Sequence, residues 1–278
     1  MATDTTAFVE NLFSLQGKRV IITGGAGAIA GTMAEALVKA GAKVCLWGRG
    51  THHPISEAVQ ALAEKTGHPE ACFGVTVDTG VEADVKKAIE ETEQTMGIPN
   101  VLINAAGGNK GKSPFIEVDI NLFSEILENN LLAGLVIPTK HLAAYWISTK
   151  VPGSIINLTS MSSYIPLSGV WAYNAAKSAV LNLTMATAKE FAPYGIRVNA
   201  IAPGFFVGNQ NRLLLYKDES MTELTDRGKS IIARTPLGRF GKNEELVGAT
   251  IFLCSDRASG FVTGVSIPVD GGFLVDNV

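Results

Sequence analysis

Tyr173 and Lys177 stand four residues apart in a segment with a helical pattern, so both side chains lie on one face of the predicted helix. A free phenol ionises near pH 10, and lowering its pKa to about 7 requires roughly 4 kcal/mol of differential stabilisation of the phenolate. A neighbouring ammonium in a poorly hydrated cleft can supply much of that. Ser160 follows a predicted strand at the end where parallel sheets place ligand contacts, and its hydroxyl can hold a substrate oxygen. Together the three residues predict proton exchange with a carbonyl or hydroxyl oxygen, although each alone is more often structural.

A glycine-rich segment, Thr23 to Ala30, joins the first predicted strand to an amphipathic helix. Glycines permit positive φ and a close approach of a pyrophosphate, and the free N–H groups and dipole of the helix attract its charge. The pattern G-x-G-x-x-G/A falls on Gly25, Gly27 and Ala30. A tight turn without a ligand is the alternative. The position at the first strand–helix junction of a βαβ series favours dinucleotide binding.

The second predicted strand leads into Gly48-Arg49 and has no acidic residue at its end. In this type of fold an acid there accepts hydrogen bonds from the ribose hydroxyls of NAD. A guanidinium in its place favours the 2′-phosphate of NADP(H), with NAD(H) still open and a solvent-facing arginine as the structural alternative. His52 and His53 follow in a predicted loop, and no other residue supplies a metal shell. We therefore expect a nucleotide cofactor and no metal.

The elements that must position these residues alternate between short β-branched runs and helical patterns, which is typical of βαβ units. We predict an α/β fold, a single Rossmann-type doubly wound domain over residues 1–278 with a seven-stranded parallel sheet and helices on both faces. The predicted strands are Arg19–Thr23, Lys43–Trp47, Cys72–Asp78, Val101–Asn104, Ser154–Leu158, Arg197–Ile201 and Val265–Val269. The predicted helices lie near 28–40, 56–66, 81–96, 119–148, 172–192 and 243–255. Residues 204–239 lack a clear strand, and we expect this segment to cover the substrate.

Composition excludes several classes of protein. Of the 278 residues, 46% are hydrophobic and 18% are charged, which suits one large core and excludes a disordered chain. A net charge of −3 argues against a nucleic-acid partner. No apolar run approaches the roughly 18 residues of a membrane span, and the start lacks the pattern of a signal peptide. Because the cysteines are few, separated and odd in number (Cys45, Cys72 and Cys254), we expect a reducing compartment and a cytoplasmic protein. The expectation of a small-molecule substrate comes from the candidate site residues and not from composition.

In combination these motifs resemble the short-chain dehydrogenase/reductase family, over nearly the whole chain from Lys18 to about Phe273. The family's loop T-G-x-x-x-G-x-G falls on the glycine-rich segment, with alanine at positions 28 and 30. Its N-N-A-G, serine, Y-x-x-x-K, P-G and D-G-G motifs fall on Asn104–Gly107, Ser160, Tyr173 to Lys177, Pro203-Gly204 and Asp270–Gly272. The resemblance implies an NAD(P)-dependent oxidoreductase.

Carried over to this chain, the family's mechanism makes Tyr173 the acid/base, while Ser160 orients the substrate oxygen. Lys177 lowers the pKa of the tyrosine and holds the nicotinamide ribose. An asparagine supports a water that relays the proton; this is Asn130, or Asn129 because residues 131–134 contain one residue more than the usual N-L-x-G. Cofactor contacts are implied for Gly24, Gly25, Gly27, Ile29, Arg49, Asp78 (to the adenine), Asn104, Gly107, Tyr173, Lys177, Pro203 and Gly204.

Within the family, residues 106–109, 200–207, 210–212 and 234–242 resemble the mannonate oxidoreductase (fructuronate reductase) branch, which is close to gluconate 5-dehydrogenases. This implies interconversion of a ketone and a secondary alcohol on a sugar acid. Reduction of another carbonyl substrate, such as 5-ketogluconate or a 3-oxoacyl thioester, and a non-catalytic nucleotide-binding protein are the alternatives.

A hydroxylated carboxylate needs a cation and several amide or hydroxyl partners, and these can come from Asn109, Gln210, Asn211 and Arg212. The alternative for Arg212, as for Arg234 and Arg239, is a surface or subunit contact. Members of the family commonly associate through the long helices that contain Asn130 and Tyr173. The resemblance therefore implies a homodimer or a homotetramer.

Overall fold

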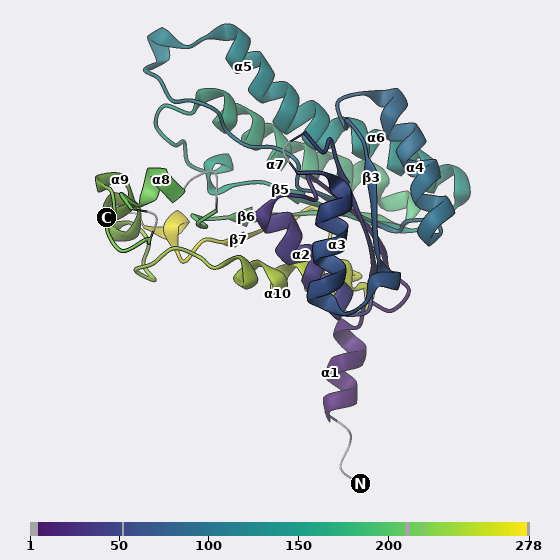
Figure 1. Ribbon diagram of the computed structural model, residues 1–278. Helices are drawn as coiled ribbons and strands as arrows, with labels where there is room; N and C mark the ends of the chain where they lie inside the picture. The colour runs from purple at the N-terminus through teal and green to yellow at the C-terminus, as the bar shows by residue number, and fades with distance from the viewer. Residues whose placement is uncertain (1–4, 52, 209–211, 219, 277–278) are drawn as a thin grey trace.

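The computed structural model describes residues 5–51, 53–208, 212–218 and 220–276. At its centre lies a seven-stranded parallel sheet with the strand order β3-β2-β1-β4-β5-β6-β7 (Figure 1). The predicted α/β fold is confirmed, and each strand end lies within two residues of its prediction. The strands are β1 Arg19–Thr23, β2 Lys43–Gly48, β3 Cys72–Thr76, β4 Val101–Asn104, β5 Gly153–Leu158, β6 Ile196–Pro203 and β7 Ser266–Val269.

Helices cover both faces of the sheet because alternate strand residues are apolar on both sides. In β1, Val20 and Ile22 belong to the core cluster on one face, and Ile21 belongs to the cluster on the other. The first cluster includes side chains of α2 Ala28–Lys39, α3 Ile55–Thr66 and α10 Val247–Cys254. The second includes side chains of α4 Glu82–Met96, α6 Ile137–Thr149 and α7 Trp171–Phe191.

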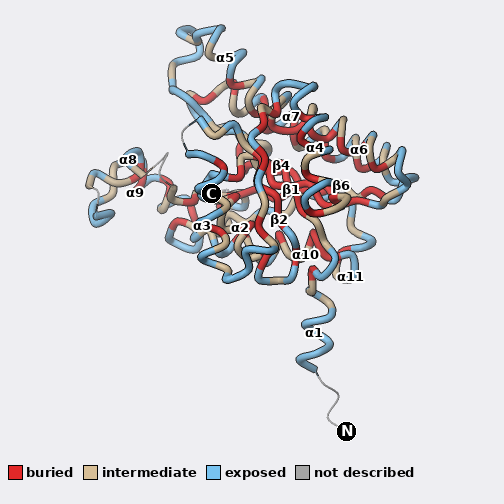
Figure 2. The backbone as a smooth tube through the Cα atoms, turned by 45° about the vertical axis from the view of Figure 1, so that its right-hand side comes forward, coloured by how far each residue is buried: buried red, intermediate tan, exposed pale blue. Residues whose placement is uncertain are grey.

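Smaller elements complete the chain. Helix α1 Thr5–Phe13 has no buried residue and projects from the body of the molecule (Figures 1 and 2). Helix α11 Asp256–Ser259 follows α10 directly. The 3₁₀ turns are η1 Pro69–Ala71, η2 Phe115–Glu117, η4 Met161–Ser163, η5 Ala192–Tyr194, η6 Asn243–Leu246 and η7 Phe273–Val275.

The helix predicted near 119–148 is continuous but not uniform. It consists of α5 Ile120–Leu127, the π-helix η3 Glu128–Val136 and then α6. The Asp119 side chain caps α5 by accepting bonds from the backbone of Asn121 and Leu122. A π-helix bonds each residue to the fifth along the chain, so η3 accommodates the additional residue noted after Asn130.

The run Ile120–Thr149 is also long and apolar enough, by length and composition, to cross a membrane, which the sequence analysis does not predict. In the fold it packs on α7 through α5 and η3, and on α4 through α6. It carries Glu125, Glu128 and Lys140. A single helix of this kind, with such packing and charges, is weak evidence for a membrane span.

The segment 204–239 contains two helices, α8 Arg212–Leu215 and α9 Asp226–Ala233, which project from the body of the molecule (Figures 1 and 2). Leu215, Ile231 and Phe240 form a small apolar core that is separate from the two cores of the sheet. An isolated β-bridge between Phe206 and Gly241 joins the start of this segment to the chain just after its end. Its predicted role as a cover over the substrate stays a prediction.

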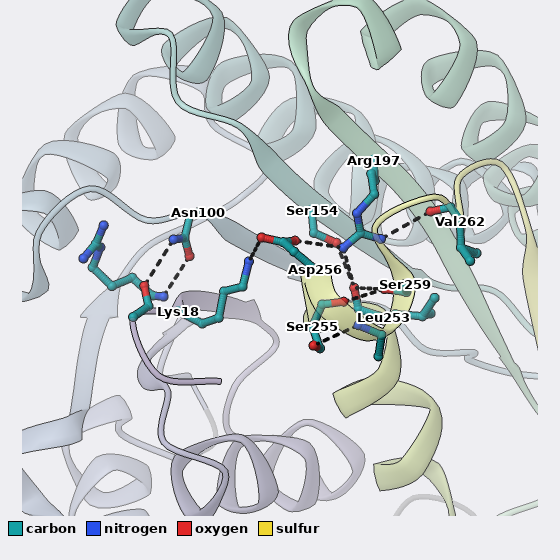
Figure 3. Close-up of polar contacts among 12 residues, drawn as sticks. Lys18, Asn100, Ser154, Arg197, Leu253, Ser255, Asp256, Ser259 and Val262 are labelled. Atoms are coloured by element: carbon teal, nitrogen blue, oxygen red, sulfur yellow. Dashed lines mark hydrogen bonds and ion pairs between the residues drawn. The ribbon is translucent and has the colours of Figure 1, made fainter. Parts of the chain in front are cut away.

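The amino-terminal edge of the sheet is fastened by charged groups (Figure 3). Asp256 accepts bonds from Lys18 Nζ at 2.5 Å and Arg197 Nη2 at 3.3 Å. The Arg197 guanidinium also donates to the carbonyl oxygens of Leu253 and Val262. This edge is therefore occupied by structural contacts, and the predicted site residues lie at the opposite, carboxyl edge.

Candidate active site

The glycine-rich loop after β1 has no room for side chains at its first two glycines. Gly24 has φ +66°, and a Cβ there would lie 2.9 Å from the backbone Cα of Ala106. A Cβ on Gly25 would lie 2.7 Å from the Cβ of Leu46. The loop therefore turns tightly between β1, β2 and the chain that follows β4.

The loop leads into the N-terminus of α2, where no side chain caps the first backbone N–H groups. Gly27 is the N-cap, its N–H donates to Gly24 O at 2.9 Å, and no side chain caps the helix. Ala30 is 3% exposed and packs in the core, which explains how a methyl group is accommodated at that position. Ile29 packs against the same core. An uncapped helix start behind a turn of glycines is a suitable site for a pyrophosphate.

The strand order reverses direction between β1 and β4, which is where open α/β sheets form a ligand crevice. Thr23 Oγ1 accepts bonds from the N–H groups of Ala105 and Ala106, at 3.0 and 3.1 Å, and so joins the two chain segments that leave the sheet. The predicted cofactor residues Gly24 and Gly107 lie on these segments, one on each side of the reversal.

Asn104 is buried at the carboxyl end of β4. Its side chain is 2% exposed, and Nδ2 donates to Thr139 Oγ1 and Asn157 Oδ1, both at 2.9 Å. It is the last residue of β4, and its side chain lies on the face that α6 covers, so it joins β4 to β5 and α6. The predicted contact of residue 104 with the cofactor stays a prediction.

Helix α7 brings Tyr173 and Lys177 together as predicted. Lys177 Nζ lies 5.8 Å from the centroid of the Tyr173 ring and donates to Leu158 O at 2.7 Å. Ser160, which follows β5, is buried, and its Oγ accepts a bond from Ser162 N at 3.1 Å. The side chains of Ser160 and Tyr173 are in hydrogen-bond contact.

The pKa of the phenol differs in direction from the prediction. Burial raises the pKa of Tyr173 above its ordinary value, and the hydrogen bond with Ser160 lowers it only in part. Burial also lowers the pKa of Lys177 to about 8, because the apolar surroundings disfavour its charge. The ammonium of Lys177 donates to the backbone carbonyl of Leu158, and desolvation is the largest influence on the pKa of the phenol.

Asn130 is buried and bonded to the backbone of the chain that follows β4, and its predicted role stays a prediction. Asn130 is 1% exposed; its Nδ2 donates to Gly108 O at 2.7 Å and to Ile126 O at 2.9 Å, and its Oδ1 accepts from Gly108 N at 2.9 Å. A Cβ on Gly107, which has φ +142°, would lie 2.5 Å from this Oδ1. The side chain of Asn130 therefore fixes the backbone of residues 107–108.

Three further predicted cofactor positions lie along the same edge of the sheet. Asp78 is half-buried just after β3, and its Oδ1 accepts a bond from Gly80 N. Pro203 ends β6. A Cβ on Gly204 would lie 2.6 Å from Asp270 Cα, so glycine allows the D-G-G segment to approach.

Arg49 is exposed at the end of β2 and lines an open pocket. The other lining residues are Gly50, Pro54, Ile55, Ser56, Val59, Gly74 and Thr76. No acidic side chain is among them. The environment of Arg49 is therefore open to an anionic group.

The predicted substrate residues are only partly brought together. Asn109 is exposed and donates to Gly111 O at 2.9 Å, and Arg212 begins α8. Gln210 and Asn211 lie outside the described residues. Arg234 and Arg239 pair with Asp276 and Glu245, which supports their structural alternative.

Sequence reasoning missed one residue that shapes the site. Asn174 lies next to Tyr173, and its amide bonds the backbone of Leu167 in both directions, donating to Leu167 O at 2.8 Å and accepting from Leu167 N at 3.3 Å. It fixes the loop between Ser160 and α7. The only signal in the sequence was an amide inside the Y-x-x-x-K motif, which does not reveal a backbone partner seven residues earlier.

The arrangement can bind a dinucleotide at the glycine loop and exchange a proton with an oxygen between Ser160 and Tyr173.

The sequence profile of a family described as enoyl-(acyl carrier protein) reductase matches residues 24–274. The chain is 36% identical to gluconate 5-dehydrogenase of Gluconobacter oxydans, over 95% of this chain and 98% of the relative.

Two solved structures are similar in fold and sequence, each with a TM-score of 0.84 and 32% identity. One, a candidate D-mannonate oxidoreductase from Haemophilus influenza with bound NAD, matches over 96% of this chain and 98% of its own. The other, a gluconate 5-dehydrogenase from Burkholderia cenocepacia in complex with NADP and tartrate, matches over 97% and 100%. The likeness extends over almost the whole length of each chain.

Proposed function

The chain belongs to the short-chain dehydrogenase/reductase family, and from this premise we propose that it interconverts a ketone and a secondary alcohol on a sugar acid, with a nicotinamide cofactor. The observation that carries the proposal is the grouping of Tyr173, Lys177 and Ser160 at the carboxyl edge of the sheet. The glycine loop and the uncapped start of α2 lie at the same edge and fit the cofactor's pyrophosphate.

The bound cofactor supplies or accepts the hydride, and the protein supplies position and proton exchange. Ser160 holds the reacting oxygen by a hydrogen bond, and Tyr173 gives that oxygen a proton in reduction or takes one in oxidation. Lys177 follows Tyr173 by about one turn of α7, and in this proposal it holds the ribose of the cofactor. Asn130 keeps residues 107–108 in position and is the candidate support for the relay water.

The sugar-acid assignment is supported by the names of similar proteins, a gluconate 5-dehydrogenase and a candidate D-mannonate oxidoreductase. It is tested with purified protein, NADPH or NADH, and three substrates: fructuronate, 5-ketogluconate and a 3-oxoacyl thioester. We expect turnover of a sugar acid. The thioester represents the acyl-carrier chemistry in the description of the matching family, and turnover of the thioester alone would discard the proposal.

We propose that NADP(H) is preferred over NAD(H). The exposed guanidinium of Arg49 and the absence of an acidic side chain among the lining residues of its pocket suit a 2′-phosphate. Arg49→Ala should weaken NADPH binding about tenfold, which is usual for the loss of one charge-assisted contact, and leave NADH binding unchanged. Titrations followed by tryptophan fluorescence measure both dissociation constants. Equal losses for the two cofactors would contradict the preference.

We propose that the protein forms a homo-oligomer through the α5–η3 and α7 surface. Ile120, Leu132 and Met185 on these elements are 71%, 45% and 48% exposed, so neighbouring helices present large apolar side chains at the surface. Sedimentation equilibrium should give a dimer or a tetramer, and Leu132→Asp with Met185→Asp should lower the mass. A monomeric wild-type protein would refute this proposal.

A further inference from the structure

Two segments beside Tyr173 are joined into one wall. Ser113, between β4 and α5, donates its N–H to Gly169 O at 3.2 Å and accepts a bond from Trp171 Nε1 at 3.0 Å. The ring of Phe115 meets Trp171 edge to face, with 5.4 Å between centroids. Because Trp171 is the first residue of α7, the wall is attached to the helix that carries Tyr173.

Lys112 lies across this wall. Gly169 has φ +78°, and a Cβ there would lie 2.5 Å from Lys112 Cγ and 2.7 Å from its Cε. The aliphatic stem therefore runs over the bare backbone of Gly169, four residues before Tyr173. Packing along a backbone reduces the conformational freedom of a lysine while its ammonium stays in water. Lys112 is exposed, so its charge is available to a ligand.

Most other cations of residues 108–117 and 204–239 are already paired. Within the described part of these segments the pairs are Lys110–Glu125, Lys217–Glu223, Lys229–Asp226, Arg234–Asp276 and Arg239–Glu245. Lys112, Arg212 and Arg227 have no ion pair among the described residues. Arg212 and Arg227 lie on α8 and α9, whereas Lys112 packs on the chain that leads into Tyr173.

We propose that Lys112 is the residue that binds the carboxylate of the substrate and so selects sugar acids over neutral ketoses. The inference rests on the proposed function and specifies how its site recognises the acid. With the reacting oxygen held by Ser160 and Tyr173, the carboxylate at the other end of a polyhydroxy acid needs a cation on a fixed support. The wall formed by Ser113, Gly169 and Trp171 provides that support.

The test compares Lys112→Met with wild type, because methionine retains an aliphatic stem over Gly169 and removes the charge. For 5-ketogluconate and fructuronate we expect KM to rise about tenfold or more with kcat within about twofold, since the contact is the same in ground and transition states. For the neutral ketoses L-sorbose and D-fructose, kcat/KM should not change. Lys112→Arg should recover most of the affinity for the acids.

The matched control is Lys110→Met, which removes a lysine two residues away that is paired with Glu125. Its kinetics with the acids should equal those of wild type. An unchanged KM for the acids in Lys112→Met, or a larger increase in Arg212→Met, would overturn the inference while wild-type turnover of acids still supports the proposed function. A wild-type enzyme that reduces no sugar acid would overturn both.

Discussion

At the scale of single residues, desolvation disfavours the charged forms of both Tyr173 and Lys177. The pKa of the phenol is raised and that of the amine is lowered to about 8, in each case chiefly by desolvation. Such pairs of shifted groups at the end of a sheet are typical of acid/base sites. A phenol that stays protonated at neutral pH can give a proton to a ketone oxygen in the reductive direction.

Tyr173→Phe removes the proton donor and keeps the ring. We expect turnover to fall by at least a hundredfold, the usual contribution of a general acid, while the affinity for NADPH stays within about twofold. Stopped-flow measurement of the reduction step and a fluorescence titration of the cofactor give the two quantities. Activity close to wild type would remove Tyr173 from its role.

Lys177→Met tests the buried amine through stability as well as rate. Because the pKa of Lys177 is lower in the folded protein than the ordinary 10.4, the unfolded chain binds more protons between about pH 8 and 10. The contribution of Lys177 to stability therefore rises with pH across this window, by an amount on the order of 2 kcal/mol.

Urea denaturation of wild type and Lys177→Met at several pH values isolates this contribution, since titrations of the cysteines and other tyrosines are common to both. The free energy of unfolding of wild type, relative to the variant, should increase from pH 8 to pH 10. A constant difference would show that Lys177 is not desolvated. Turnover by the variant should be lost at every pH.

At the scale of elements, two asparagines hold the loops around the reacting groups by the same pair of hydrogen bonds from side chain to backbone. Asn130 in η3 bonds the backbone of Gly108 in both directions, and Asn174 in α7 does the same with Leu167. Each side-chain amide supplies the hydrogen-bond donor and acceptor that a neighbouring strand would otherwise supply to this stretch of backbone. The π conformation of η3 carries Asn130, and π turns are frequent at functional sites.

Asn174→Ala removes both bonds to Leu167 and frees the loop before α7. We expect kcat/KM for the substrate to fall about tenfold, which corresponds to the loss of two hydrogen bonds of ordinary strength. The dissociation constant of NADPH should not change. Asn174→Asp, which keeps an acceptor for the Leu167 N–H, should lie between wild type and alanine. An equal loss of cofactor affinity would assign Asn174 a general structural role instead.

At the scale of the whole molecule, the two edges of the sheet have different functions. The amino edge is fastened by Lys18, Arg197 and Asp256 (Figure 3). The carboxyl edge carries the candidate site. Burial raises the pKa of Asp256, but the bonds to Lys18 and Arg197 outweigh burial and hold this pKa below its ordinary value. The carboxylate therefore stabilises the fold above its unfolded-state pKa, and this contribution is lost as pH falls through its folded-state pKa.

Asp256→Asn should lower the melting temperature at pH 7 by a few degrees or less, consistent with about 1 kcal/mol for a partly exposed ion-pair network. The difference between wild type and variant should shrink below about pH 4, where the carboxylate is protonated first in the unfolded chain and then, at lower pH, in the folded protein. Scanning calorimetry from pH 3 to 8 measures this difference in melting temperature, with activity at pH 7 as the control. A difference that is independent of pH would attribute the effect to packing.

The sequence by itself determined the parallel sheet and its strands, because alternating β-branched runs and helical periods follow from burial on both faces. It also determined that Tyr173 and Lys177 share a helix face, since four residues make about one turn. The glycine loop followed from local rules too, because its glycines are required by backbone geometry within a few residues.

Only the tertiary structure decided the matters that depend on distant partners. It turned the side chain of Asn104 into the core, bonded the side chain of Asn130 to the backbone of Gly108, and placed Lys112 over Gly169. It also reversed the predicted direction of the pKa of Tyr173. Desolvation and side-chain pairing depend on what lies nearby in space, and one-dimensional spacing carries no information about neighbours that lie far away along the chain.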